Sequence, residues 1–146
     1  MRFVLLVLLA LPVFAQDTAD PATEVRASID QLFDGMRAGD SLMVRQVFHP
    51  EARLQTTGTR DGQTFMQLAD IEQFIAAIGS PRDEVWDEQI ENVVIQVDGP
   101  LASAWMDYAF YVGERQSHCG ANAMQFFHTG ERWQLVNIMD VRRPCA

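Results

Sequence analysis

Lysine is absent from this sequence of 146 residues, and all eleven of its basic residues are arginines. Without lysine, the chain lacks a side-chain amine for Schiff-base chemistry and the lysine of a phosphate-binding loop. Twenty acidic residues bring the net charge to −9 at pH 7, and the arginines are scattered singly except for Arg142-Arg143. Because nucleic-acid binding needs a basic stripe, this distribution excludes nucleic acid as a partner. The negative charge also argues against anionic membranes.

Long apolar runs are missing except at the start of the chain. Arg2 precedes an apolar run from Phe3 to Leu11, and Val13-Phe14-Ala15 has the small-x-small pattern of a cleavage site. A membrane span needs about 20 residues, so we expect no membrane span. The pattern is typical of a secretory signal peptide, residues 1–15, whose removal leaves residues 16–146 as one secreted or periplasmic domain. A buried N-terminal helix or strand is the alternative.

Cysteine is scarce, with only Cys119 and Cys145. An oxidising compartment permits a disulfide between them, although a domain of this size does not require one. His118 and Cys119 are neighbours in an expected strand, so they point to opposite faces and cannot bind one ion together. We therefore expect no metal site and no cofactor.

Apolar periodicity predicts three helices near the N-terminus, followed mainly by strands. The helices begin at Asp20-Pro21, at Asp40 or Ser41, and at Ile71 after the capping residue Asp70. The expected strands are an extended segment through Thr57, its return over Thr64–Leu68, and then Trp86–Val97, Leu101–Val112, Ser117–His128 and Trp133–Arg142. This order predicts an α+β fold in which a strongly curved antiparallel sheet wraps over the helices and encloses a pocket. The acidic residues between Asp83 and Glu91 are interpreted as a solvated strand edge.

Alternation along the strands predicts which side chains share a face. Two-residue loops at Gly113-Glu114 and Gly130-Glu131 would pair Val112 with Arg115 and Thr129 with Arg132. One face then carries Trp105, Asp107, Tyr111, His118, Asn122, Met124, Phe126, Leu135, Asn137 and Met139. The opposite face carries Met106, Tyr108, Phe110, Cys119, Ala121, Ala123, Val136, Ile138, Asp140 and Arg142. Alternation leaves open which face lines the pocket, and a one-residue bulge would exchange the faces of the last strand.

Two segments resemble a known superfamily. The segment "DQLFDGMRAGDSLMVRQVFHPEARL", residues 30–54, resembles the opening of nuclear-transport-factor-two-like proteins, which include ketosteroid isomerases and SnoaL-like polyketide cyclases. The segment from Leu101 to Cys145 resembles the branch named putative lumazine-binding, through its Trp, Tyr-x-Phe-Tyr, Ser-His-Cys-Gly and Asp-x-Arg-Arg elements. Val141 stands where that pattern has threonine. The resemblance implies a cone-shaped domain around a pocket, in a superfold that hosts both enzymes and non-enzymes.

Three residues are candidates for acid–base catalysis: His118, Asp107 and Asp140. An imidazole titrates near neutral pH and can act as a general base. Either aspartate, combined with Tyr108 or Tyr111, could provide the carboxylate and the acidic donor that a ketosteroid-isomerase mechanism needs. The alternative is that His118 is only held within the sheet, by hydrogen bonds to Asp140 or Arg142.

Aromatic residues in the last strands belong either to the core or to a pocket for a planar ligand. The candidate ligand-binding residues are Trp105, Tyr108, Tyr111, His118, Asn122 and Arg142. Two functions stay open. One is a non-catalytic exported domain that binds a small apolar or aromatic molecule or serves in assembly. The other is an isomerase, cyclase or dehydratase that uses His118 and an aspartate. Both sheet faces are largely apolar, which predicts a homodimer.

Overall fold

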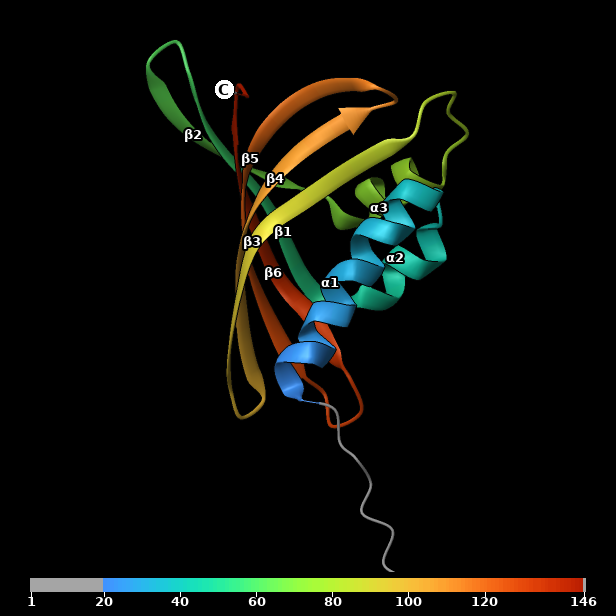
Figure 1. Ribbon diagram of the computed structural model, residues 1–146, viewed down its shortest axis with the longest axis vertical. Helices are drawn as coiled ribbons and strands as arrows, with labels where there is room; N and C mark the ends of the chain where they lie inside the picture. Colours follow the sequence, from blue (N-terminus) through green and yellow to red (C-terminus); the bar gives the residue numbers. More distant parts are fainter. Residues whose placement is uncertain (1–19, 146) are drawn as a thin grey trace, which may run out of the picture.

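The computed structural model describes residues 20–145, and its helices and strands follow the expected order (Figure 1). The predicted signal peptide, residues 1–15, lies outside the described residues. The elements are α1 (Pro21–Ala38), α2 (Ser41–Val47), β1 (Phe48–Arg60), β2 (Gln63–Ala69), α3 (Ile71–Gly79), β3 (Trp86–Asp98), β4 (Leu101–Val112), β5 (Arg115–His128) and β6 (Trp133–Arg143). Within the described residues, no helix is both long enough and apolar enough to cross a membrane.

The helix ends follow from their local sequence. Pro21 occupies the first turn of α1, and Gly39 ends this helix in the left-handed conformation with φ 68°. The Asp40 carboxylate caps α2 by accepting from two backbone N–H groups, and Asp70 caps α3 by accepting from the Gln73 N–H. The Asp20 side chain makes no cap hydrogen bond, so proline is the main start signal of α1.

All six strands form one curved sheet in the order β2-β1-β6-β5-β4-β3, with the helices packed against one side (Figure 1). Neighbouring strands are antiparallel except β1 and β6, which pair in parallel. That pair joins the first and last strands of the chain, so no turn signal could predict it. The α+β fold with a curved sheet over three helices is confirmed.

The core lies between the concave face of the sheet and the helices. The apolar stripe of α1 contributes its buried side chains to this core, and the other helices and strands complete it. Fully buried members include Val25, Ile29, Val44, Ile78, Met106, Phe126 and Leu135. This layer fixes α1 against the sheet, and none of the three helices of residues 20–145 lies on the convex face (Figure 1).

Two β-bulges decide which side chains face the helices. In the first hairpin, Val112 pairs with Arg115 around the two-residue loop Gly113-Glu114. In the second hairpin, His128 pairs with Trp133 around the short connection that follows His128. Beyond these hairpins, however, Ser117 and Val136 are extra residues that have no partner in the ladder. Each extra residue shifts the register by one and exchanges the two faces from that point onward.

The predicted division of the faces is therefore wrong for β5, whose residues lie on the other side relative to β4 and to the second half of β6. His118 and Asn122 share the concave side with Tyr108, Phe110, Asp140 and Arg142, because Phe110 pairs with His118 and Asn122 pairs with Asp140. Trp105, Asp107 and Tyr111 lie on the convex side. The bulges bring together the polar residues that the expected register had separated.

A disulfide joins Cys119 to Cys145, with their Cα atoms 5.0 Å apart. Cys119 pairs with Arg143 in the ladder, whereas the expected pairing of Thr129 with Arg132, continued along the two strands, would place Cys119 opposite Arg142. The bridge holds the segment after β6 on the neighbouring strand β5. Disulfides of this kind persist in oxidising compartments.

Candidate ligand pocket

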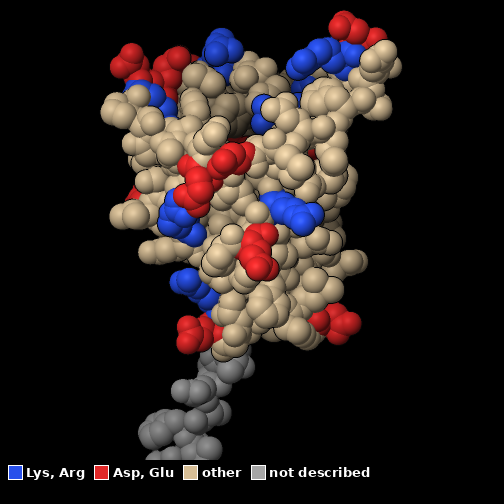
Figure 2. Space-filling model, turned by 180° about the vertical axis from the view of Figure 1, so that it is seen from behind, with Lys and Arg blue, Asp and Glu red and all other residues tan. Residues whose placement is uncertain are grey.

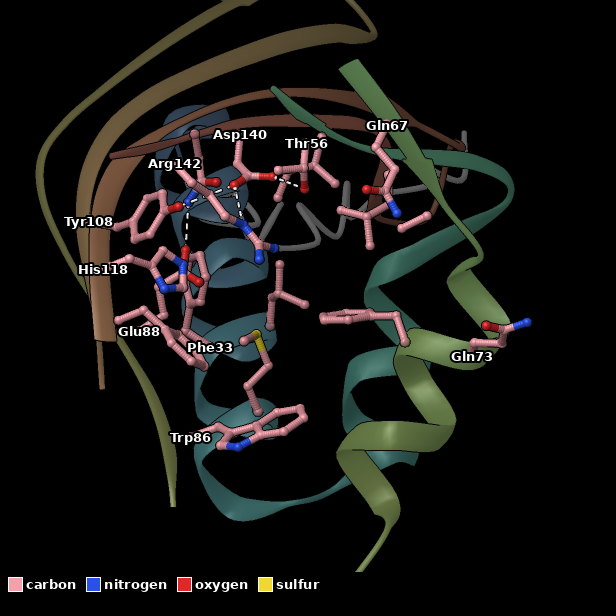
Figure 3. A pocket seen from close by; sticks show the side chains of 18 of the residues that line it. Phe33, Thr56, Gln67, Gln73, Trp86, Glu88, Tyr108, His118, Asp140 and Arg142 are labelled. Atoms are coloured by element: carbon pink, nitrogen blue, oxygen red, sulfur yellow. Dashed lines mark hydrogen bonds and ion pairs between the residues drawn. The ribbon is translucent and has the colours of Figure 1, made fainter. Parts of the chain in front are cut away.

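A cavity of about 700 Å³ lies between the concave face of the sheet and the helices (Figure 3). Its apolar wall is built mainly by α1, α3 and the ends of the neighbouring strands. The residues of this wall include Leu32, Phe33, Met36, Leu54, Phe74, Trp86, Phe110 and Ile138. The sheet side carries a polar cluster of Glu88, Tyr108, His118, Asn122, Asp140 and Arg142. A cavity with apolar walls and a few converging polar groups is the usual form of a small-molecule site.

Asp140 anchors this cluster through three hydrogen bonds. Its Oδ1 accepts from the Thr56 hydroxyl at 2.6 Å, and its Oδ2 accepts from the Tyr108 hydroxyl and from Arg142 Nε, each at 3.1 Å. The side chain is buried at the pocket wall. Asp140, on β6, thereby links β6 to β1 and, across β5, to β4, and it orients Tyr108 and Arg142.

Gly120 allows Tyr108 to reach Asp140. A Cβ atom at Gly120 would collide with the Tyr108 ring and with the Val141 carbonyl oxygen. Glycine therefore leaves the space in which the Tyr108 ring lies across β5. Burial and the nearby Asp140 carboxylate raise the pKa of Tyr108, so the phenol stays protonated and keeps its proton for donation.

Glu88 is the polar residue of the sheet-side cluster that the sequence did not indicate as a candidate. Its Oε1 accepts a hydrogen bond of 2.7 Å from Asn122 Nδ2. Burial raises the pKa of Glu88 to about 7, with Asp140 adding to this rise and Asn122 and Arg142 opposing it. The acidic run had been interpreted as a solvated edge, but alternation places Glu88 on the same face as Trp86. The sequence signal for the burial of Glu88 was the large apolar residue Trp86, two positions earlier on the same strand and therefore on the same face.

His118 lies in the cluster without a carboxylate partner. Its Nδ1 is 3.2 Å from the Ser117 hydroxyl, and its ring packs on Phe110 with a centroid distance of 5.1 Å. No hydrogen bond to Asp140 or Arg142 forms among the described residues. Burial and the positive charge of Arg142 lower the pKa of His118, so the neutral imidazole is favoured near pH 7.

The remaining sequence-predicted residues divide between pocket and outer surface. Arg142 lines the pocket with a largely exposed guanidinium group (Figure 3). Trp105 lies on the convex face. Asp107 accepts hydrogen bonds there from Asn92 and Arg143. The Tyr111 hydroxyl accepts a hydrogen bond from Gln116. Across residues 20–145, no group of three histidine, cysteine or acidic side chains is arranged to hold a metal ion.

Comparisons with known proteins identify the family. Residues 20–139 match the family described as "Putative lumazine-binding". No curated protein matches the chain. This family match covers most of the chain.

Solved structures share the fold at low sequence identity. The beta subunit of a putative aromatic-ring-hydroxylating dioxygenase from Novosphingobium aromaticivorans is 14% identical with TM-score 0.69, covering 86% of this chain and 90% of its own. An NTF2-like protein with a cystatin-like fold from the same organism is 13% identical with TM-score 0.69, covering 86% and 84%. A putative dehydratase of the NTF2-like family from Streptomyces avermitilis is 12% identical with TM-score 0.64, covering 85% and 96%. The protein thus belongs to the putative lumazine-binding family and has the nuclear-transport-factor-two-like (NTF2-like) fold.

Proposed function

We propose that this protein binds a small, largely aromatic molecule in the cavity between the sheet and the helices. The observation that supports this proposal most directly is a cavity of about 700 Å³ with mainly apolar walls and a polar cluster on the sheet side. An apolar molecule gains free energy by leaving water, while the polar cluster fixes its orientation. Both oxygens of Asp140 already accept hydrogen bonds from its own chain, so the groups with most freedom to contact a ligand are Glu88, His118 and Arg142.

Lumazine, the molecule in the family description, has properties that suit this cavity. It is a flat bicyclic molecule with N–H and C=O groups along its edge. Aromatic residues on the wall, among them Phe33, Phe74, Trp86 and Phe110, can contact such faces, and the polar cluster can contact such an edge. Flat heteroaromatic molecules are therefore the first ligands to test.

Native mass spectrometry of protein purified from its own host tests this function. We expect an additional mass on the folded protein that is released as a small molecule on denaturation. Ala69→Trp, at the pocket wall, should reduce the bound fraction at least tenfold, because the indole occupies ligand space. Thr64→Trp, on the same strand but outside the pocket lining, is the matched control. Equal ligand occupancy in both variants would overturn the assignment of this cavity.

Proton transfer in the same cavity is the second candidate function, favoured by the carboxyl group of Glu88, whose pKa is about 7. A base with this pKa can remove a proton near neutral pH and return it elsewhere, as an isomerase, cyclase or dehydratase requires. The sequence-based alternative paired His118 with an aspartate. Because both oxygens of Asp140 already accept hydrogen bonds, Glu88 takes the place of the aspartate in this proposal.

Hydrogen–deuterium exchange of 2-tetralone, a small aromatic ketone with acidic C–H bonds, tests catalysis. A proton-transfer enzyme would accelerate exchange, and Glu88→Gln would lower the rate at least a hundredfold, since the amide cannot accept the proton. Glu91→Gln, an exposed position on the same strand, is the control. Exchange at the same rate in wild type and Glu88→Gln would leave binding alone as the function.

We also propose that the mature chain, residues 16–146, is exported as a single domain to the periplasm or the medium. Arg2, the apolar run Phe3–Leu11 and the cleavage pattern ending at Ala15 support it, together with the disulfide between Cys119 and Cys145. The intact mass of the exported protein should correspond to a chain that begins at Gln16. A retained Met1 would contradict the cleavage.

A homodimer through the convex face is the final part of the proposal. Four large apolar side chains on β3, β4 and β5 are exposed by 44–57%: Val94, Leu101, Trp105 and Phe127. Apolar patches on soluble proteins often mark interfaces. Wild type should sediment as a dimer at micromolar concentration, and Trp105→Glu should shift it to monomer, whereas Thr59→Glu should not. A monomeric wild type at that concentration would contradict the dimer.

A further inference from the structure

The two carboxyl groups on the sheet side of the pocket, those of Asp140 and Glu88, differ in which hydrogen bonds their oxygens accept. Asp140 accepts hydrogen bonds at both oxygens from groups of its own chain. Glu88 accepts at Oε1 from Asn122, and no hydrogen bond or ion pair within residues 20–145 reaches its Oε2. Glu88 is half-buried and lines the cavity, so this oxygen is open to a molecule in the cavity. Glu88 thus offers the cavity an acceptor that the folded chain leaves without a partner.

The groups on the sheet and on the helices around Glu88 determine whether its negative charge has a counter-ion. From the sheet, Tyr108, His118, Asp140 and Arg142 face the same cavity. Arg142 directs its Nε to Asp140 instead of pairing with Glu88. The lining side chains of α1 are uncharged, and Asp70 before α3 is the acidic residue on the helical side of the cavity. Glu88 is therefore surrounded by groups that leave its charge without a direct counter-ion.

Resting on the proposed function of binding, we propose that Glu88 selects the ligand, and that the preferred ligand is an uncharged aromatic molecule whose N–H or O–H group donates to Glu88. A ligand anion would meet the negative charge of Glu88, while the charges of Asp140 and Arg142 are already paired with each other. An uncharged donor instead completes the hydrogen bonding of Oε2 while its ring lies against apolar residues such as Phe110 and Trp86. The selected class is a phenol, an imide or a ring with a comparable N–H group.

The proton on Glu88 makes this selection depend on pH. An ionised carboxylate only accepts hydrogen bonds, whereas the neutral carboxyl also carries a donor. A ligand donor stabilises the ionised form, so its binding strengthens as pH rises through about 7, the pKa of Glu88. A ligand of the same shape without a donor displaces water from the carboxylate and does not replace the lost hydrogen bond. Because this loss is greatest for the ionised form, such a ligand binds more strongly as pH falls.

Two matched probes test the proposal: 2-naphthol, which has an O–H donor, and 2-methoxynaphthalene, which lacks it. Both are uncharged from pH 5.5 to pH 8. Calorimetric titration of wild type across this range should show the affinity ratio of naphthol to ether rising roughly five- to tenfold, since charge-assisted hydrogen bonds exceed neutral ones. Glu88→Gln should give a ratio that is constant with pH, and Glu91→Gln should reproduce wild type.

The outcomes separate this inference from the proposed function. A rising ratio in wild type that becomes constant in Glu88→Gln supports selection by Glu88. If both probes bind wild type with a ratio independent of pH, selection by Glu88 is wrong while aromatic binding stands. If neither probe binds, the proposed function fails and the inference fails with it. The wild-type profile decides even if Glu88→Gln does not fold.

Discussion

The concave and convex faces of the sheet are built from the same strands but have opposite properties. Phe126 is fully buried against the helices, whereas its neighbour Phe127 is 44% exposed on the other side. His118 faces the pocket, and the next residue, Cys119, forms the disulfide. Since neighbours alternate between faces, one extra residue reassigns a whole strand. The bulges at Ser117 and Val136 thereby decide which residues form the site.

Truncating the two neighbouring phenylalanines should give the largest contrast between the faces. Phe126→Ala should lower the free energy of unfolding by about 3–5 kcal/mol, because it opens a cavity in the core. Phe127→Ala removes a partly exposed ring and should cost about 1 kcal/mol or less. Urea unfolding of the two variants at equal protein concentration measures both. Equal losses would contradict the division between covered and uncovered faces.

Removing the disulfide should have the next largest effect. Cys119→Ser with Cys145→Ser opens a loop that spans a sequence separation of 26 residues. The chain-entropy model assigns such a loop about 3–4 kcal/mol of stability. Because the bridge leaves β5 on the face opposite the pocket, aromatic ligand binding should persist in the folded double variant. Unchanged stability on urea unfolding would show that the bridge does not constrain the chain.

Glu88 should make stability depend on pH. Its folded-state pKa of about 7 is raised above the ordinary value of 4.5, so the unfolded chain loses this proton first as pH rises. Stability should therefore decrease between pH 4.5 and pH 7, and the full cost is about 3 kcal/mol above that range. Glu88→Gln should remove this dependence and be more stable than wild type at pH 8, with little difference near pH 4. A constant difference from pH 4 to pH 8 would contradict the raised pKa.

Replacing His118 should have the smallest effect. His118→Gln keeps a polar group beside Ser117 and removes only the titration of an imidazole whose pKa is lowered by burial and by Arg142. We expect folding and ligand retention, with stability within about 1 kcal/mol of wild type. Chemical unfolding and native mass spectrometry measure these properties. Loss of a measurable turnover in a folded His118→Gln protein would favour the enzyme function.

Local signals in the sequence were sufficient to predict the elements and fold class. Pro21, Gly39, Asp40 and Asp70 mark helix boundaries through short-range chemistry, so they could be read directly. The parallel pairing of β1 with β6 depends on contacts between distant segments, and no local residue type specifies it.

The site was harder to predict than the fold. Tyr108, His118, Asn122, Asp140 and Arg142 were all named as candidates, but their convergence depended on two bulges without a distinctive sequence signal. Glu88 was overlooked because an acidic run usually indicates solvent exposure. Its own neighbours on alternate positions, Trp86 and Ile90, carried the opposite information.

Titration with lumazine, followed by tryptophan fluorescence, tests the central claim that the concave cavity binds an aromatic molecule. Trp86 lines the cavity, Trp105 lies on the convex face, and Trp133 is buried in the core. The proposed site predicts saturable quenching that survives Trp105→Phe and is largely lost in Trp86→Phe, with affinity retained when binding is measured by calorimetry. Quenching that is lost in Trp105→Phe but retained in Trp86→Phe would place the ligand on the convex face and contradict the account.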